Sequence, residues 1–313
     1  MYVVKRGVAK SIRSGTSSVV VKKYIPIILF ISPAVVLVTI FVYVFSGWSA
    51  WTSLTDWRII GRLGEFIGIQ NYIKLFTQDA IFRKCFYNTL KLMVMFISLT
   101  IPLGIICAVF LDLVVRGRGL FRAIFLIPLS FSFVASATMW SWMFLPDKGA
   151  INTLFRTLNL FFLTQPWITS TGQSIISVAI VYVWQFSGFA TLVYYAGISS
   201  VDPDILDAAR VDGTTTFQRY ARVVLPLQRP ATFTVLLILL MYSLRVFDLV
   251  WLLTGGGPAF SSEVLATYMY RVTFNQNLFA YGASVSFFMF MLSFVIIIVP
   301  ILVNRYINRY IKR

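Results

Sequence analysis

The sequence alternates long apolar stretches with short polar segments that hold most of the charged residues. A helix needs about 20 predominantly apolar residues to cross roughly 30 Å of hydrocarbon, because each residue adds about 1.5 Å along its axis. Stretches of this length predict six membrane-crossing helices, near residues 24–45, 89–115, 123–144, 173–198, 231–253 and 278–302. We therefore expect an all-α polytopic membrane protein.

The first apolar stretch could belong to a signal peptide, because basic residues that include Lys22 and Lys23 precede it. Its length of 22 residues exceeds the apolar region of such signals, which is about 7 to 15 residues long. We expect a retained helix, so that a short segment, residues 1–23, precedes a transmembrane domain over residues 24–313.

The distribution of Lys and Arg predicts that both termini lie in the cytoplasm. In that orientation the cytoplasmic segments hold 17 of these residues and the outer ones hold 9, with Arg245 inside a helix. Cytoplasmic loops carry such an excess in membrane proteins. The basic tail supports the same choice through Arg305, Arg309, Lys312 and Arg313.

Composition agrees with a membrane protein and excludes several functions. The chain is 58% hydrophobic and 12% charged, and its net charge of +16 is divided among short basic groups between apolar stretches. This arrangement argues against nucleic acid as a partner. The absence of His excludes His-ligated metal sites and His-based catalysis, so we expect no metal site. The only cysteines, Cys85 and Cys107, are expected to be free thiols.

The loop at residues 199–230 predicts two short helices separated by a break. Asp202 is a favourable N-cap, and Pro203 suits the first helical position after it. Gly213 permits the left-handed backbone conformation that ends a helix. Thr214 can cap a second helix, and Pro226 limits the length of that helix. We expect a compact helical projection from the membrane.

The spacing within this loop resembles the EAA loop of ABC importer permeases. That pattern has an acidic residue, two alanines, a glycine after three residues and, after nine more, an aliphatic residue, any residue, Leu and Pro. The matching positions are Asp207, Ala208, Ala209, Gly213, Val223, Leu225 and Pro226. The family usually has Glu at the first position. The resemblance implies a type I ABC importer permease fold whose coupling helix docks on an ATP-binding subunit.

Further motifs resemble the sugar-importer branch related to the maltose permeases, and they look like the first of its two permease types. They are Gly68, Asn71 and Tyr72, Asn88-Thr89-Leu90, Phe247-Asp248 and Thr254-Gly255-Gly256-Gly257-Pro258. The resemblance implies a second, different permease subunit, two ATP-binding subunits, an extracytoplasmic sugar-binding protein and a bacterial or archaeal cytoplasmic membrane. For the coupling helix, it implies buried alanines at Ala208 and Ala209, with Asp207, Arg210 and Asp212 pairing at the rim.

The sequence lacks a phosphate-binding loop, since the glycine run at 255–257 has no following Lys. We interpret that run as a turn that ends a helix. We expect ATP and Mg²⁺ to be bound by partner subunits, with no cofactor in this chain and no enzymatic activity of its own. The resemblance implies transport by alternating access, driven by that ATP cycle.

One face of the fourth apolar stretch is a candidate sugar site. Tyr182, Gln185, Phe186 and Phe189 follow helical spacing, and their rings and amide suit a pyranose. They lie where the maltose permeases contact ligand, and Ser243 is the matching position on the fifth stretch. Ordinary helix packing is the alternative for the aromatic residues.

Arg245 and Asp248 lie three residues apart, and we expect an intramembrane ion pair between them. Alternatively, Arg245 contacts an anion or a sugar. We expect a sugar substrate, with an oligosaccharide first and a polyol, glycerol phosphate or sugar acid as alternatives. An ion-coupled secondary transporter or a membrane enzyme would be a different class, which the EAA-like loop and the scarcity of acidic groups disfavour.

Overall fold

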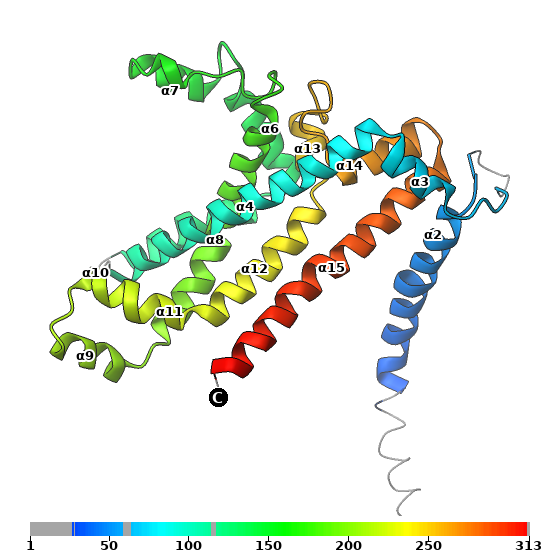
Figure 1. The fold of residues 1–313 in the computed structure, drawn as a ribbon. Helices are drawn as coiled ribbons and strands as arrows, with labels where there is room; N and C mark the ends of the chain where they lie inside the picture. The colour runs from blue at the N-terminus through cyan, green and yellow to red at the C-terminus, as the bar shows by residue number, and fades with distance from the viewer. Residues whose placement is uncertain (1–26, 28, 59–63, 114–116, 312–313) are drawn as a thin grey trace, which may run out of the picture.

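The computed structural model describes residue 27 and the ranges 29–58, 64–113 and 117–311. Within these ranges the chain is almost entirely helical, and its one β-type pairing is a bridge between Thr55 and Phe66 (Figure 1). The predicted all-α fold is confirmed. The N-terminal segment 1–23 and the last two basic residues, Lys312 and Arg313, lie outside the described residues.

Four helical segments are continuous, and each is long and apolar enough to cross a membrane. They are Leu29–Ser53, Ala80–Leu113, Ser174–Ser199 and Phe279–Tyr306. The first includes the π-helix η1 (Thr39–Val44) and α2 (Phe45–Ser53). The others lie in α4 (Ala80–Leu113), α8 (Ser174–Ser199) and α15 (Phe279–Ile311).

Two further spans are bent rather than straight. α5 (Arg118–Ser130) and α6 (Phe133–Met143) meet at 97°, because Phe131 is extended and Ser132 starts a new helix by accepting the N–H of Ala135. The single helix expected near 123–144 is therefore divided. Counting each bent pair as one span gives up to six spans in the described part of the chain.

The other bent span leads from the loop at 199–230 into the bundle. α10 (Thr216–Arg219), η3 (Tyr220–Val224) and α11 (Leu225–Leu227) continue into α12 (Arg229–Leu244) across a bend of 64°. α12 then ends, residues 245–247 are non-helical, and α13 (Asp248–Leu253) follows. The stretch expected over 231–253 is thus two helices.

α8 is the central helix of the bundle. It packs along α4 and against α5 and α12, and most residues of its apolar part are buried. Small residues permit this packing: a Cβ on Gly188 would lie 1.8 Å from the carbonyl oxygen of Phe125, and one on Gly104 would lie 2.5 Å from the Cβ of Ala190. Close approach at small residues is a common way for membrane helices to associate.

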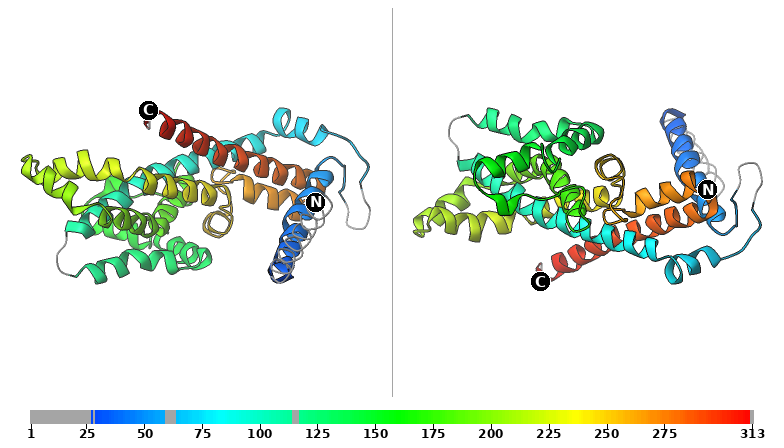
Figure 2. Two further views of the ribbon diagram at one scale, coloured as in Figure 1. Left: turned by 90° about the horizontal axis from the view of Figure 1, so that it is seen from below. Right: turned by 90° about the horizontal axis from the view of Figure 1, so that it is seen from above.

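Most short elements gather at the two ends of the spans, at the bottom and the top of Figure 1, and Figure 2 shows the molecule from below and from above. α9 (Pro203–Val211) and α10 form one end, called here the coupling-loop end. The opposite end holds α3 (Gln70–Thr77), α7 (Ala150–Thr157), α14 (Leu265–Tyr270) and η4 (Arg271–Asn275). The main packing partner of α2 outside its own span is α15. The apolar surface of this span is therefore open to lipid or to another subunit.

Candidate functional site

The helical projection at residues 199–230 forms as its capping residues predict. Asp202 accepts the backbone N–H of Asp204 at 3.0 Å, and Gly213 ends α9 with a φ of +76°. The cap of the second helix was placed one residue early. Thr215 and Gln218 form a reciprocal capping box, whereas the hydroxyl of Thr214 donates to the carbonyl of Ala209 at 2.6 Å.

The surface of this projection differs from the one inferred by resemblance. Asp207 accepts a 2.6 Å ion pair from Arg210, and both side chains are exposed. Ala208 is exposed, but Ala209 is buried within its own chain and so cannot reach a partner subunit in this conformation. α10 packs against α9 on this projection.

Sequence reasoning missed the apolar side chains that the same projection presents to its surroundings. Val211 is 88% exposed and Phe217 is 81% exposed, and Ile205 on α9 is exposed as well. Large apolar groups on an otherwise polar helix pair usually mark a contact surface. The available signal was an aliphatic and an aromatic residue in a loop rich in Asp and Arg.

Polar contacts connect the projection to the spans. The Tyr220 hydroxyl donates to a carboxylate oxygen of Asp112 near the end of α4. Gln228, at the bend before α12, is buried beside α8, and a Cβ on Gly197 would lie 2.0 Å from its side-chain oxygen. These contacts join the projection to α4 and place the bend before α12 against α8.

The residues predicted to contact sugar lie mostly inside the bundle. Tyr182 donates to the carbonyl of Tyr242 at 2.8 Å, and the Gln185 amide donates to the carbonyl of Phe131 at 2.8 Å. Both residues are buried, as are Phe186 and Ser243, while Phe189 is half-buried. In this conformation their contacts are those of interior packing, and direct contact with substrate stays a prediction.

The expected ion pair between Arg245 and Asp248 is absent from the ion pairs of the described residues, so that prediction is wrong for this conformation. The physical reason is the break in the helix, since Arg245 follows α12 and Asp248 begins α13. Both side chains are exposed, and with Tyr182 and Phe247 they border a small cavity.

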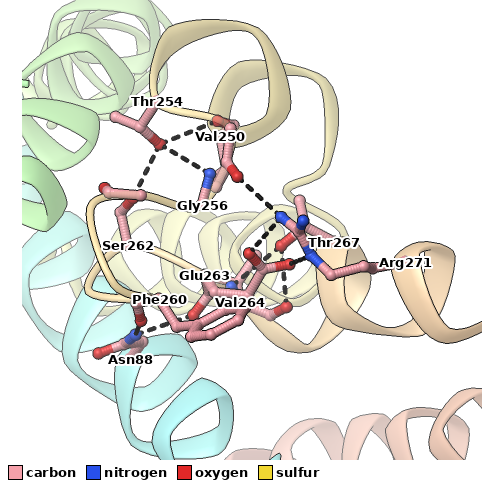
Figure 3. A network of polar contacts seen from close by, with 12 residues as sticks. Asn88, Val250, Thr254, Gly256, Phe260, Ser262, Glu263, Val264, Thr267 and Arg271 are labelled. Carbon is pink, nitrogen blue, oxygen red and sulfur yellow. Dashed lines mark hydrogen bonds and ion pairs between the residues drawn. The ribbon is translucent and has the colours of Figure 1, made fainter. Parts of the chain in front are cut away.

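A buried polar network lies at the opposite end of the bundle (Figure 3). The Glu263 side chain is fully buried and accepts an ion pair from Arg271 at 2.8 Å. Arg271 also donates to the carbonyl of Gly255 at 2.8 Å. The Asn88 amide, from α4, donates to the carbonyls of Phe260 and Glu263 at 3.0 and 2.9 Å.

The glycine run contributes to this network as a turn after α13. Gly256 has a φ of +80°, and a Cβ there would lie 1.8 Å from a carboxylate oxygen of Glu263. The Thr254 hydroxyl accepts bonds from Ser262 and from the N–H of Gly256. The run therefore supports a buried carboxylate, which its sequence alone does not indicate.

The other motifs that carried the resemblance also hold this end together. Asn71 donates to the carbonyls of Ser53 and Thr55 at 2.9 and 2.8 Å, and Tyr72 shares a 2.7 Å hydrogen bond with Ser53. Burial raises the pKa of the Tyr72 phenol, although the Ser53 hydrogen bond lowers it in part. Gly68 precedes α3 with a φ of +62°.

Sequence reasoning also missed Glu263 and Arg271, which were counted only as charges. The available signal was that Glu263 is the last of the 11 acidic residues and that Arg271 is the next charged residue after it. Across the described residues, no group of three or more Cys, Asp or Glu side chains could hold a metal ion. Cys85 and Cys107 are both free.

The chain belongs to a known family of transporter components. Residues 100–313, more than half of the chain, match the family described as the binding-protein-dependent transport system inner membrane component. A probable ABC transporter permease of Pyrococcus horikoshii is 38% identical over 272 residues, which cover 87% of this chain and 93% of that protein. The predicted membership of the ABC importer permeases is confirmed.

Other relatives carry names that include sugars. A xylose/arabinose import permease of Haloferax volcanii is 31% identical over 84% of this chain and 82% of its own length. A trehalose/maltose transport system permease of Thermococcus litoralis is 29% identical over 86% of this chain and 90% of its own length.

A solved structure shares the fold. A chain of a bacterial ABC transporter involved in the import of the acidic polysaccharide alginate superposes with a TM-score of 0.79 at 23% identity, over 92% of this chain and 97% of that one. The fold is thus that of an ABC importer permease, a membrane component of a transporter.

Proposed function

We propose that this chain forms one half of the translocation pathway of an ATP-driven, binding-protein-dependent sugar importer. The observation that carries the proposal is the exposed projection of α9 and α10, which matches the EAA loop of the family and is joined to α4 by the Tyr220–Asp112 hydrogen bond. Such a projection can turn movement of a partner into movement of the spans.

The partners in this proposal are a second, different permease, two ATP-binding subunits and an extracytoplasmic sugar-binding protein. ATP and Mg²⁺ belong to the ATP-binding subunits, and this chain performs no hydrolysis. A solved alginate transporter complex that includes an alginate-bound periplasmic protein, with a TM-score of 0.80 to this chain, supports the binding-protein partner. The coupling-loop end and both termini face the cytoplasm of a bacterial or archaeal cell.

Docking on the ATP-binding subunit involves apolar as well as charged side chains. Val211, Phe217 and Ile205 fill a groove on the partner, because their exposure in water is unfavourable. Asp207 and Arg210 lie at the rim, where charges affect orientation more than affinity. Asp212 and Gly213 end α9 and set the direction of the chain toward α10.

The transported molecule meets this chain at the break between α12 and α13. Arg245 and Asp248 are charged and exposed where α12 ends and α13 begins, and lipid hydrocarbon does not tolerate exposed charges. They therefore face the pathway or the second permease. Tyr182 lines the same small cavity as these two residues, and a change of conformation that opens this cavity would expose its ring and hydroxyl.

Sugars, and oligosaccharides first among them, are the proposed substrate class. The names of the relatives from Haloferax and Thermococcus support sugars, and rings with adjacent polar groups suit them. A sugar acid is a second candidate, because Arg245 is exposed and forms no ion pair with a described residue. Transport proceeds by alternating access, with the projection following the ATP-dependent closure of its partner.

Reconstitution tests the proposal. The chain is placed in proteoliposomes with its second permease and ATP-binding subunits, and its binding protein is added outside. Labelled xylose, glucose, maltose, trehalose and galacturonate are offered separately. We expect uptake of at least one saccharide that requires enclosed ATP and the binding protein. Uptake by this chain alone, driven by an ion gradient, would overturn the proposal.

A further inference from the structure

Four aromatic rings form a continuous strip between the α12–α13 break and the opposite end of the bundle. We call this strip the aromatic ladder: Phe247, Trp251, Tyr270 and Phe274. The rings of Phe247 and Trp251 stack at 5.8 Å with an interplanar angle of 13°. Tyr270 lies 5.1 Å from Trp251 and 5.0 Å from Phe274. Each ring therefore contacts the next.

The ladder differs from the aromatic cluster in the core. Tyr182 and Phe186 are 1% and 4% exposed, whereas the first three ladder rings are half-buried and Phe274 is 59% exposed. The ladder is thus more exposed than the core cluster, and its most exposed ring is Phe274.

Charged groups lie beside two rings of the ladder, Phe247 and Trp251, which argues against a lipid neighbour at those positions. Phe247 shares its cavity with Arg245 and Asp248, both of them exposed. The guanidinium of Arg271 lies 5.5 Å from the centre of the Trp251 ring. Because exposed ionisable side chains face water or protein rather than hydrocarbon, we place the strip against the translocation pathway.

The buried network holds Arg271 against the middle of the ladder. Arg271 is held by the buried carboxylate of Glu263 and by the Gly255 carbonyl, and it lies between the rings of Trp251 and Phe260. A ring fixed before its ligand arrives loses little conformational freedom on binding. The network therefore holds Trp251 in one orientation.

We propose that the aromatic ladder is a saccharide track, on which the apolar faces of successive sugar rings lie as the substrate moves from the binding protein to the α12–α13 break. Aromatic faces provide apolar contact that different sugar rings can use. Hydrogen-bond donors and acceptors for the hydroxyl groups come from Arg245, Asp248 and Arg271. The track rests on the proposed function, and it adds a path to the sugar site.

Accessibility to a membrane-impermeant methanethiosulfonate reagent tests where the ladder faces. In the full complex carrying Cys85→Ala and Cys107→Ser, single variants Trp251→Cys and Tyr270→Cys are treated from outside after trapping with vanadate. Phe294→Cys, an exposed position on α15, is the matched membrane control, and Phe161→Cys is the water-exposed control. We expect the ladder variants to react like Phe161→Cys. Reaction as slow as that of Phe294→Cys would overturn the track.

Uptake tests whether the rings themselves matter. With the saccharide that the wild-type complex imports from the panel above, Trp251→Leu and Tyr270→Leu should each lower uptake about tenfold at subsaturating substrate, whereas Trp251→Phe and Tyr270→Phe stay within about twofold. Phe162→Leu, an exposed aromatic off the ladder, is the control. Equal uptake by the Leu and Phe variants would overturn the track alone, while a wild-type complex without ATP-dependent uptake would overturn the proposed function.

Discussion

The hydroxyl of Tyr220 donates a hydrogen bond to the carboxylate of Asp112, and this contact joins the coupling loop to the end of α4. α4 runs the length of the bundle beside the central helix α8. Its other end holds Asn88, which bonds the loop around Glu263. One helix thus connects the proposed docking site to the buried network at the opposite end.

Tyr220→Phe should weaken coupling without preventing assembly. The substitution keeps the ring and removes the hydroxyl that donates to Asp112. A hydrogen bond to a charged group contributes about 1.5 to 3 kcal/mol, so we expect the amount of sugar imported per ATP hydrolysed to fall roughly tenfold or more. Parallel assays of uptake and phosphate release measure this ratio. Tyr87→Phe, an exposed tyrosine on α4, is the control, and an unchanged ratio would contradict the role of the bond.

Asp207→Lys should uncouple ATP hydrolysis from transport, because it reverses a charge at the rim of the docking surface and places two cations beside each other on α9. The double variant Asp207→Lys with Arg210→Glu separates these effects. It restores an ion pair within the helix but keeps the reversed charge toward the partner. We expect the double variant to remain uncoupled. Recovery of transport by this variant would assign Asp207 to local helix stability alone.

The capping residues of the coupling loop could be predicted from the sequence because their effects are local. Asp202, Pro203 and Gly213 act on backbone groups within a few residues, so their effect on α9 follows from the sequence. The shift of the second cap from Thr214 to Thr215 is a local choice between adjacent hydroxyls, which the capping box with Gln218 decides.

The breaks in the spans and the buried network could not be predicted from the sequence, because they depend on contacts between distant segments. Phe131 is extended where its carbonyl can accept the amide of Gln185 from another helix. Glu263 is buried because Asn88 and Arg271 reach it from α4 and η4. Hydrophobic periodicity does not reveal the contact between Phe131 and Gln185 or the contacts that bury Glu263. Continuous helices and an Arg245–Asp248 pair were therefore the natural expectations.

Gly256→Ala should destabilise the protein far more than Gly255→Ala. Both glycines have a positive φ, but a Cβ on Gly256 would lie 1.8 Å from Glu263, whereas the nearest atom to one on Gly255 is 4.0 Å away. Disrupting a buried ion pair costs about 3 to 5 kcal/mol, and a left-handed Ala costs about 1 to 2 kcal/mol. Thermal unfolding of the two variants in detergent compares them directly. Equal losses of thermal stability in the two variants would show that the positive φ alone, and not the contact with Glu263, explains the glycine at position 256.

Asp79→Ala should loosen the junction between α4, α14 and α15. Asp79 accepts the N–H of Phe82 at 2.8 Å as a helix cap, and it accepts hydroxyl groups from Tyr268 and Tyr281. Burial and the neighbouring carboxylate raise the pKa of the Tyr268 phenol, which stays protonated and able to donate at neutral pH. We expect a loss of about 2 to 4 kcal/mol, measured by thermal unfolding. The adjacent Gln78→Ala should leave stability nearly unchanged, and an equal effect of both would exclude the specific role of the carboxylate.

Gln185→Leu distinguishes packing from sugar recognition at the centre of the bundle. The amide nitrogen of Gln185 supports the corner at Phe131, so its loss should cost about 1 to 3 kcal/mol of stability. Its side-chain oxygen is buried and unbonded within the described part of the chain, and a sugar hydroxyl donor in another conformation would satisfy it. We therefore expect a lower unfolding temperature together with a severalfold higher half-saturating sugar concentration. Thr100→Val removes another buried, unbonded oxygen and is the control. A lower unfolding temperature with unchanged half-saturation would leave Gln185 as a packing residue and assign sugar contact to the exposed groups at the α12–α13 break.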